Sequence, residues 1–404
     1  MSLNLMFIFM VFLFVFNIKL NFFPYYSNLV FSVLGVGVVL FFFLRNPNLH
    51  INRSIFKLLF LMLCIPFSFC VSLLFNSDSN DFYYLKTFFL NNLVYLFSAI
   101  FLFFYFFRVK GLNYDDYIKW LAIVVSLQLI FSMIGFLNSS FFDFIFKFIA
   151  MERDFSTLGD MSEYRLVGIG ASFFGSGVIN TITLLLIADS IVRKNNKNFL
   201  ILILCFIVIA FIGVLSSRTT IVGLILSCFI FLINLKSNIK LVYAFCAAFL
   251  SFIIVYPVLS VYNDRVATIF DFGLSFIFDF SNSEAASSVG VLQEYFKIIP
   301  DNFKTWLIGD ARFGDQMVYY KNTDVGFYRI IFCTGIMGLL AFFVLQFYVL
   351  FEIKNSYLKR TNKVLIFAAL VILNFKGVAS FFVILILPYL LSVDDGCQEK
   401  DVIK

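Results

Sequence analysis

Charged side chains are scarce in this chain. Aspartate, glutamate, lysine and arginine together make up 13% of its 404 residues, whereas soluble globular domains contain about 25%. Hydrophobic residues account for 62% of the 404 positions, and phenylalanine alone for 61 of them. A membrane-spanning helix uses about 20 apolar residues, so the chain has enough for about a dozen spans. This composition excludes a soluble enzyme, a disordered chain and a nucleic-acid-binding protein.

Groups that support metal, nucleotide and acid–base chemistry are also rare. The sequence has no glycine-rich phosphate loop, so any work must use a pre-activated substrate or a gradient. Its single histidine, His50, lies between Arg45 and Arg53. Six of the seven cysteines fall inside apolar runs, and no pair has the spacing of metal ligands. We interpret them as small buried hydrophobic residues and expect neither a metal nor a cofactor.

Apolar stretches bounded by polar clusters predict an all-α polytopic membrane protein with about twelve transmembrane helices. The predicted spans are 3–18, 27–44, 55–75, 88–107, 117–137, 166–187, 199–215, 219–234, 241–262, 326–351, 364–373 and 378–391. The first stretch lacks a basic segment and a cleavage site, so we expect a retained helix rather than a signal peptide. The last two are short, and residues 374–377 alone separate them.

The basic residues indicate the orientation of these spans. If the N-terminus is cytoplasmic, every inner loop contains more lysine and arginine than its outer neighbours, as the positive-inside rule requires. The short outer connections hold only Lys19, Lys86, Arg218 and Lys376. A missed span would reverse the alternation. The pattern therefore predicts twelve spans with both termini in the cytoplasm.

This topology divides the chain into four parts. Residues 1–262 would hold nine spans and an outer loop at 138–165, and residues 263–325 a long extracytoplasmic loop. Residues 326–393 would hold three further spans, and residues 394–404 a cytoplasmic tail. An interfacial helix is predicted at 141–148 and a loop helix at 284–299. Because loops of this length usually carry function, we expect any chemistry on the extracytoplasmic side.

Two arginines lie close to the predicted outer boundary. Arg165 closes the first large outer loop, and Arg218 occupies a very short turn between two spans. A guanidinium near hydrocarbon is costly unless it is paired, and its planar fork suits phosphate oxygens. Together the two arginines predict a site for a lipid pyrophosphate. The alternatives are snorkelling to headgroups or pairing with a carboxylate such as Asp324.

Glycines follow Arg165 at positions 168, 170, 175 and 177. They predict a small-residue surface on one helix, which serves helix packing or the close approach of backbone to a ligand. A second glycine pair, Gly335 and Gly338, predicts close packing of the tenth span.

A third polar cluster lies where the long loop re-enters the membrane. Its charged members are Asp310, Arg312, Asp315, Asp324 and Arg329. Asp324 suits a base or an orienting acceptor, and equally the N-cap of the next helix. Aromatic residues of the same loop are candidates for stacking on sugar rings, or for packing on the membrane surface. They are Tyr295, Trp306, Phe313, Tyr319 and Tyr320.

These clusters, in this order, resemble the O-antigen polymerase family (Wzy-type), within the wider polymerase–ligase group. The overall plan of about twelve spans with one long outer loop late in the chain also resembles that family. The matching segments are Arg165–Gly168, Ser217–Thr219, Ile308–Asp310, Asp324–Gly326 and Gly335–Gly338. The resemblance implies a GT-C-like membrane architecture.

The resemblance also implies an activity. Members of the family join undecaprenyl-pyrophosphate-linked oligosaccharide repeat units on the periplasmic face of the bacterial inner membrane, without a metal. Donor and acceptor would both be polyprenyl-pyrophosphate-linked glycans, and a chain-length regulator protein is a candidate partner. Arg165 and Arg218 would hold the pyrophosphate, and Asp324 would orient the acceptor hydroxyl. The candidate substrate-binding residues are Arg312, Arg329, Asp310 and Asp315.

Two alternatives stay open at this point. The O-antigen ligase branch uses an outer-loop histidine, and Asp324 occupies that neighbourhood here, which favours a polymerase. A polysaccharide flippase or other transporter is the second alternative. The long outer loop, the lack of internal repeats and the few charges within the spans argue against it.

Overall fold

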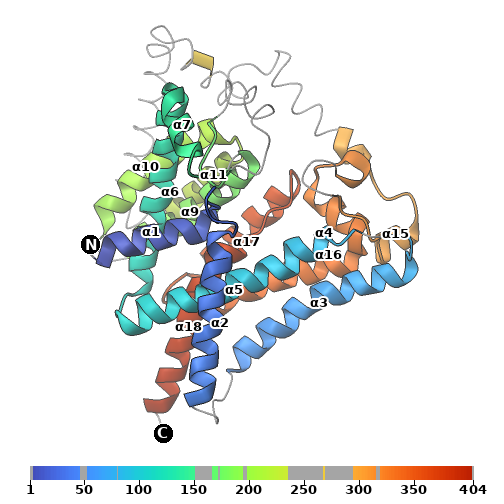
Figure 1. The fold of residues 1–404 in the computed structure, drawn as a ribbon, viewed down its shortest axis with the longest axis horizontal. Coiled ribbons are helices and arrows are strands. Elements are labelled where there is room, and N and C mark those ends of the chain that lie inside the picture. The colour runs from blue at the N-terminus through green and yellow to red at the C-terminus, as the bar shows by residue number, and fades with distance from the viewer. Residues whose placement is uncertain are drawn as a thin grey trace. The chain divides into compact units, whose positions relative to one another are not determined.

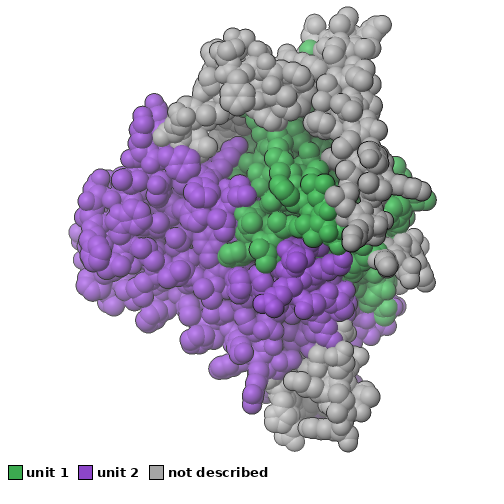
Figure 2. Space-filling model, turned by 180° about the vertical axis from the view of Figure 1, so that it is seen from behind, with its two compact units in different colours: residues 1–30, 111–286, 364–369 green, residues 31–110, 287–363, 370–404 purple. Residues whose placement is uncertain are grey.

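The protein is represented by a computed structural model. It describes residues 3–45, 52–79, 81–150, 166–171, 173–193, 198–234, 267–268, 294–314 and 319–402. The chain divides into two compact units, which Figure 2 distinguishes by colour. Unit 1 comprises Met1–Val30, Gly111–Ala286 and Val364–Ala369, and unit 2 comprises Phe31–Lys110, Ser287–Lys363 and Leu370–Lys404.

Both units are built from helices (Figure 1), and β-structure in the described ranges is limited to isolated bridges. Seven described helices are long and apolar enough to cross a membrane. They are α2 (Ser27–Arg45), α3 (Arg53–Phe75), the continuous helix Tyr83–Val109, α6 (Tyr114–Leu137), α9 (Phe173–Val192), α10 (Phe199–Ser216) and α16 (Gly326–Glu352). Large apolar side chains such as Phe60, Phe67 and Leu200 stay exposed on them. The protein is therefore a helical membrane protein, as its composition predicts.

The remaining helices are shorter, and several carry further apolar segments. They include α1 (Leu3–Phe16), α7 (Ser139–Phe146), α11 (Thr220–Ile233), α17 (Arg360–Asn374) and α18 (Phe382–Val402). Every predicted span in the described part of the chain falls on a helix, and α7 coincides with the predicted interfacial helix. The predicted span at 241–262 lies outside the described residues, as does most of the predicted helix at 284–299, of which residues 294–297 are helical. The total of twelve spans stays a prediction.

One predicted span begins later than the sequence indicates. The sequence predicts a helix from residue 166, but α9 begins at Phe173, and the described residues before it are not helical. Gly170 has a φ of +74°, and an added Cβ there would collide with the carbonyl oxygen of Phe16. The prediction of one helical surface for Gly168, Gly170, Gly175 and Gly177 is therefore wrong for the first two. At Gly170 the missing side chain permits close backbone approach.

Unit 1 is organised around α9, which packs against α6, α10 and α11. Nearly all of its side chains are buried, including the fully buried carboxylate of Asp189. Arg193 lies one turn later, and its Nε is 3.2 Å from Asp189 Oδ2. Its Nη2 is 3.0 Å from Asp115 Oδ1, near the start of α6. The buried charge of Asp189 is therefore compensated by an arginine that also links α9 to α6.

Unit 2 places the predicted inner and outer loops at opposite ends. At one end, the Ser54 carbonyl at the start of α3 accepts hydrogen bonds from Tyr348 near the end of α16 (2.9 Å) and Tyr389 of α18 (2.7 Å). At the other end, Asn76 just after α3 donates to the Gly309 carbonyl at 3.0 Å, in the loop whose Ala311 N–H binds the Cys333 carbonyl in the first half of α16. Helices α3 and α16 are thus antiparallel. This arrangement agrees with the alternation that the basic residues predict for these helices.

The Arg193 link yields a test of stability. Arg193→Leu would leave the fully buried Asp189 carboxylate without its cation, so we expect a loss of about 3–5 kcal/mol of unfolding free energy. The measurement is thermal unfolding of the purified protein in detergent. Arg108→Leu is the matched control, because its pair with Asp394 is long at 3.8 Å and the arginine side chain is 53% exposed. An equal shift for both variants would contradict the role of the buried pair.

Candidate functional site

The structure places the predicted site residues in different parts of the molecule. Arg165 and Asp315 lie outside the described residues. Arg218 belongs to unit 1, whereas Asp310, Arg312, Asp324 and Arg329 belong to unit 2. The predicted convergence of Arg165 and Arg218 on one pyrophosphate thus stays a prediction.

In unit 1, Arg218 sits at the tip of the turn between α10 and α11. The turn is closed by hydrogen bonds from the Ser217 N–H to the Gly213 carbonyl (2.8 Å) and from the Thr220 N–H to the Ser217 carbonyl (2.9 Å). Arg218 is half-buried, while Ser217 and Thr219 on either side are buried. The short connector therefore holds the base of the Arg218 side chain in one place.

Polar side chains of α9 fasten this turn. Ser176 and Ser216 hydrogen-bond each other at 3.0 Å, Asn180 donates to Thr220 Oγ1 at 3.3 Å, and Thr181 donates to the Thr219 carbonyl at 3.2 Å. Buried hydroxyl and amide groups in a membrane protein need such partners. A side chain at Gly177 would collide with Thr219 Oγ1, which bears out the packing interpretation of this glycine.

In unit 2, α16 is interrupted at Gly335. This residue has φ +65° and ψ −166°, a combination that is essentially restricted to glycine. A Cβ there would also collide with the carbonyl oxygen of Leu307. The sequence predicts that this glycine permits close helix packing. The structure bears this out, because Leu307 is the last residue of α15 (Phe303–Leu307), and it adds that Gly335 also breaks α16.

The interruption gives α16 carbonyl groups that accept from the loop. The Asp310 N–H donates to the Phe332 carbonyl at 2.6 Å, and the Ala311 N–H donates to the Cys333 carbonyl at 3.0 Å. Gly309 has a φ of +86°, and a Cβ on it would collide with the Cys333 carbonyl. The Ile308–Asp310 segment of the family resemblance thus binds α16 beside Gly335.

Polar residues at the end of α3 hold the other edge of the same loop. Ser72 donates to the Ile308 carbonyl, Asn76 to the Gly309 carbonyl at 3.0 Å, and Ser79 to the Ala311 carbonyl. The sequence analysis missed these residues. Polar residues recur at intervals of three or four from Ser68 and Ser72 in the last turns of α3 to Asn76 and Ser79 just after it, and this spacing is their signal in the sequence.

Asp81 is a second residue that the sequence analysis missed. Its Oδ2 accepts from the N–H groups of Phe313 and Gly314, each at 2.6 Å, and its Oδ1 accepts from the Tyr83 N–H at 3.0 Å. One carboxylate therefore holds both the start of the Tyr83–Val109 helix and the backbone of Phe313 and Gly314. The short loop contains two carboxylates, Asp78 and Asp81, and nothing in the sequence indicates that Asp81 is the one whose partners lie more than 200 positions away.

Asp310 organises the loop rather than facing open space. Its Oδ1 accepts from the Thr305 hydroxyl at 2.7 Å, and its Oδ2 accepts from the Tyr320 hydroxyl at 3.3 Å. Burial raises the pKa of Tyr320, and the neighbouring Asp310 charge raises it further, while Arg312 lowers it. Tyr320 consequently stays protonated at neutral pH and donates to Asp310.

Arg329 lies one turn into α16 and only 8% of it is exposed. Its guanidinium carbon is 3.7 Å from the centroid of the Tyr319 ring and 4.4 Å from that of Phe313. Contacts between a guanidinium and two aromatic faces are favourable when they are desolvated. Arg329 therefore joins Phe313 to Tyr319. Tyr319 also forms an isolated β-bridge with Gly314, the residue that follows Phe313.

Asp324 precedes α16 but does not cap it. The N-cap residue is Val325, and no side chain caps this helix end, so the N-cap interpretation of Asp324 is wrong. Asp324 is half-buried, and its charge acts favourably on Arg329. The role of Asp324 in orienting an acceptor stays a prediction.

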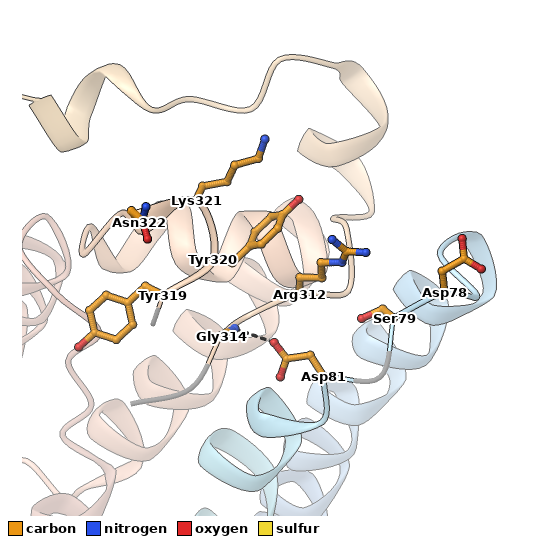
Figure 3. Close-up of a pocket in the computed structure, with 9 residues that line it drawn as sticks. All are labelled: Asp78, Ser79, Asp81, Arg312, Gly314, Tyr319, Tyr320, Lys321 and Asn322. Carbon is orange, nitrogen blue, oxygen red and sulfur yellow. Dashed lines mark hydrogen bonds between the residues drawn. The ribbon is translucent and has the colours of Figure 1, made fainter. Parts of the chain in front are cut away.

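These elements surround an open pocket of about 400 Å³ in unit 2 (Figure 3). Its lining residues are Asp78, Ser79, Asp81, Arg312, Gly314, Tyr319, Tyr320, Lys321 and Asn322. Arg312 and Lys321 flank Tyr320, with their charged groups 5.9 and 5.8 Å from the ring centroid. Lys321 and Asn322 have φ angles of +60° and +53°. Strained backbone of this kind costs on the order of 1–3 kcal/mol per residue and is common at binding sites.

The pocket combines hydrogen-bond acceptors, cations and phenol rings, but no metal site. Within the described ranges, no group of three histidine, cysteine, aspartate or glutamate side chains could hold a metal ion. Of the predicted aromatic residues, Tyr319 and Tyr320 line the pocket, whereas Phe313 is buried among Tyr83, Tyr84 and Phe88. The arrangement suits a polar ligand with an apolar face.

The break in α16 can be tested with a pair of glycines. Gly335→Ala places a side chain where neither the backbone angles nor the Leu307 carbonyl permits one. We therefore expect the free energy of unfolding to fall by about 2 kcal/mol or more, the strain of a residue held in this region. Gly37→Ala in α2 is the matched control, because an added Cβ there meets nothing within 4 Å. Alanine is the better helix former by about 1 kcal/mol, so this variant should be neutral or stabilised. Thermal unfolding in detergent distinguishes the two, and an unaffected Gly335→Ala protein would contradict the break.

A second test concerns Asp81. Asp81→Ala removes the acceptor for three backbone N–H groups, so we expect the free energy of unfolding to fall by about 1–3 kcal/mol. We also expect faster proteolysis of the loop that contains Phe313 and Gly314. Asp78→Ala in the same loop is the control, since Asp78 is exposed and makes none of these bonds. Limited proteolysis and thermal unfolding measure both effects. If the two variants behave alike, Asp81 does not hold the loop.

Comparison with known proteins gives no family assignment. The chain matches no protein-family model, no curated protein and no solved structure.

Proposed function

We propose that this protein is an O-antigen polymerase of the bacterial inner membrane. It would join undecaprenyl-pyrophosphate-linked oligosaccharide repeat units on the periplasmic face, with both of its termini in the cytoplasm. The observation that carries the proposal is in unit 2. Of the segments that resemble the family, Ile308–Asp310 hydrogen-bonds to α16 between Asp324–Gly326 and Gly335–Gly338. Three separate segments between residues 308 and 338 therefore belong to one structure beside one pocket.

The chemistry of this pocket supports a glycan ligand. Sugar rings present hydroxyl groups at their edges and C–H groups on their faces. Carboxylates, amides and hydroxyls bind the former, and aromatic rings pack against the latter. The pocket offers the Asp78 carboxylate, the Ser79 hydroxyl, the Asn322 amide and the Tyr320 ring. It lies at the end of unit 2 where the predicted outer loops meet, so a glycan outside the membrane would reach it.

The proposed reaction needs no nucleotide, because the donor is already activated. The bond between the anomeric carbon of the growing chain and its pyrophosphate oxygen breaks, and a hydroxyl of the acceptor unit bonds to that carbon. The hydroxyl proton passes to a base, for which Asp324 is the candidate, and the polyprenyl pyrophosphate leaves. Arg165 and Arg218 would stabilise the charge that develops on the leaving pyrophosphate. The fixed turn around Arg218 supports this role, because a preorganised cation needs little rearrangement during the reaction.

The test is the pattern of glycans in cells that carry or lack the gene. A polymerase defect leaves single repeat units on the lipid anchor. A ligase defect leaves polymer on the carrier lipid, and a flippase defect removes surface glycan altogether. Gel electrophoresis of the glycans separates the three outcomes. Either of the latter two patterns would overturn the polymerase proposal.

The arginine at the α10–α11 turn gives a sharper test. Arg218→Lys retains the charge but loses the planar fork, so we expect polymer yield to fall by at least tenfold at normal protein level. Arg45→Lys, at the end of α2, is the matched control and should give the wild-type ladder. Wild-type chain lengths from Arg218→Lys would refute the pyrophosphate role of this residue.

A further inference from the structure

The pocket of unit 2 contains two cations that form no ion pair with any carboxylate among the described residues. In the described part of the chain, the ion pairs join Arg108 to Asp394, and Arg193 to Asp115 and Asp189. Arg312 and Lys321 take part in none of them and contact the ring of Tyr320 instead. Both are exposed, and in Figure 3 they lie on either side of Tyr320. The free positive charge is therefore available to a ligand.

The nearby carboxylates differ in their availability. Asp81 and Asp310 are occupied by protein donors, which are three backbone N–H groups for the first and two hydroxyls for the second. Asp78 is exposed at the edge of the pocket and takes part in no ion pair within the described residues. The groups left for a ligand thus include two cations, the Asp78 carboxylate, the Asn322 amide and the Tyr320 ring.

This set distinguishes between two kinds of anion. A pyrophosphate carries several negative charges on a compact group, so the nearby Asp78 carboxylate would repel it more strongly than a single carboxylate, and the Tyr320 ring would contribute little. A sugar with one carboxylate has a single charge, several hydroxyl groups and an apolar ring face. Arginine binds a carboxylate through two parallel hydrogen bonds. The second kind of ligand uses all of the groups that remain available: the two cations, the Asp78 carboxylate, the Asn322 amide and the Tyr320 ring.

We propose that this pocket binds an acidic sugar residue, one pyranose ring bearing one carboxylate, within the glycan. The proposal rests on the proposed function, because it names the substrate class of the same protein. Arg312 binds the sugar carboxylate, and Lys321 adds attraction from the other side of Tyr320. The Tyr320 ring packs against the sugar face, and Asp78 and Asn322 accept from and donate to its hydroxyl groups. The pocket therefore selects repeat units that contain such a residue.

The experiment measures binding to the purified full-length protein in lipid nanodiscs. The probes are a glucuronic-acid-containing disaccharide, the matched neutral glucose disaccharide, and inorganic pyrophosphate. We expect the acidic disaccharide to bind at least tenfold more tightly than the neutral one. Pyrophosphate should compete weakly. Equal binding of the two disaccharides, or pyrophosphate competition at or below the acidic disaccharide's own concentration, would overturn the proposal.

Variants assign the effect to the pocket. Arg312→Gln should reduce the preference for the acidic disaccharide to about one-third of its value or less. Lys297→Gln, an exposed lysine of unit 2 outside the pocket, is the matched control and should keep the full preference. Arg312→Lys keeps the charge without the fork and should give an intermediate preference, which guards against misfolding of the glutamine variant. An unchanged preference in both Arg312 variants would contradict the proposal.

This outcome is separable from that of the proposed function. If cells that lack the gene still make polymer while the protein prefers the acidic disaccharide, the polymerase proposal fails alone. If polymer is lost while the protein binds both disaccharides equally, the pocket assignment fails alone.

Discussion

A backbone carbonyl that loses its helical partner inside an apolar medium must find another donor. The arrangement of unit 2 depends on this constraint. Gly335 interrupts α16, and the N–H groups of Asp310 and Ala311 bind the carbonyls of Phe332 and Cys333. The loop that approaches in this way has carbonyls of its own, which the end of α3 satisfies through Ser72, Asn76 and Ser79. A break in one helix is thereby converted into a fixed loop between two helices.

Unit 1 applies the same rule to a turn. The connector that carries Arg218 is only the short turn between α10 and α11, and the hydroxyl groups of Ser217 and Thr219 on it are buried among apolar helices. Asn180 and Thr181 of α9 bind it, and the missing side chain of Gly177 leaves the space that Thr219 occupies. In both units, then, small and polar residues within apolar helices hold a charged or polar segment at a helix end. The family resemblance and the fixed segments coincide at Ser217–Thr219 and at Ile308–Asp310.

The sequence predicts the helices well, because long apolar runs and loop charges are local signals. The helix bounds of α2, α3, α6, α10 and α16 differ from the predicted spans by three residues or fewer. The prediction of a helix fails at residues 166–171, where Gly170 adopts a positive φ that no hydropathy pattern reveals. Of the candidate site, Arg312, Arg329 and Asp310 follow from their motifs. Asp81, Ser72 and Ser79 do not, because their partners lie more than 200 positions away in the sequence.

The tie between Asp81 and the backbone of Phe313 and Gly314 has a consequence for how such a chain can change. The connection after α3 is short, and the later loop is long, but they share one set of hydrogen bonds. A loop exchanged between two proteins of this architecture would arrive without its supporting serines, asparagine and aspartate. The side chains of Ser72, Asn76, Ser79 and Asp81 and the backbone of Ile308–Gly314 therefore have to be exchanged together, and a chimera that receives only one of the two segments loses these hydrogen bonds.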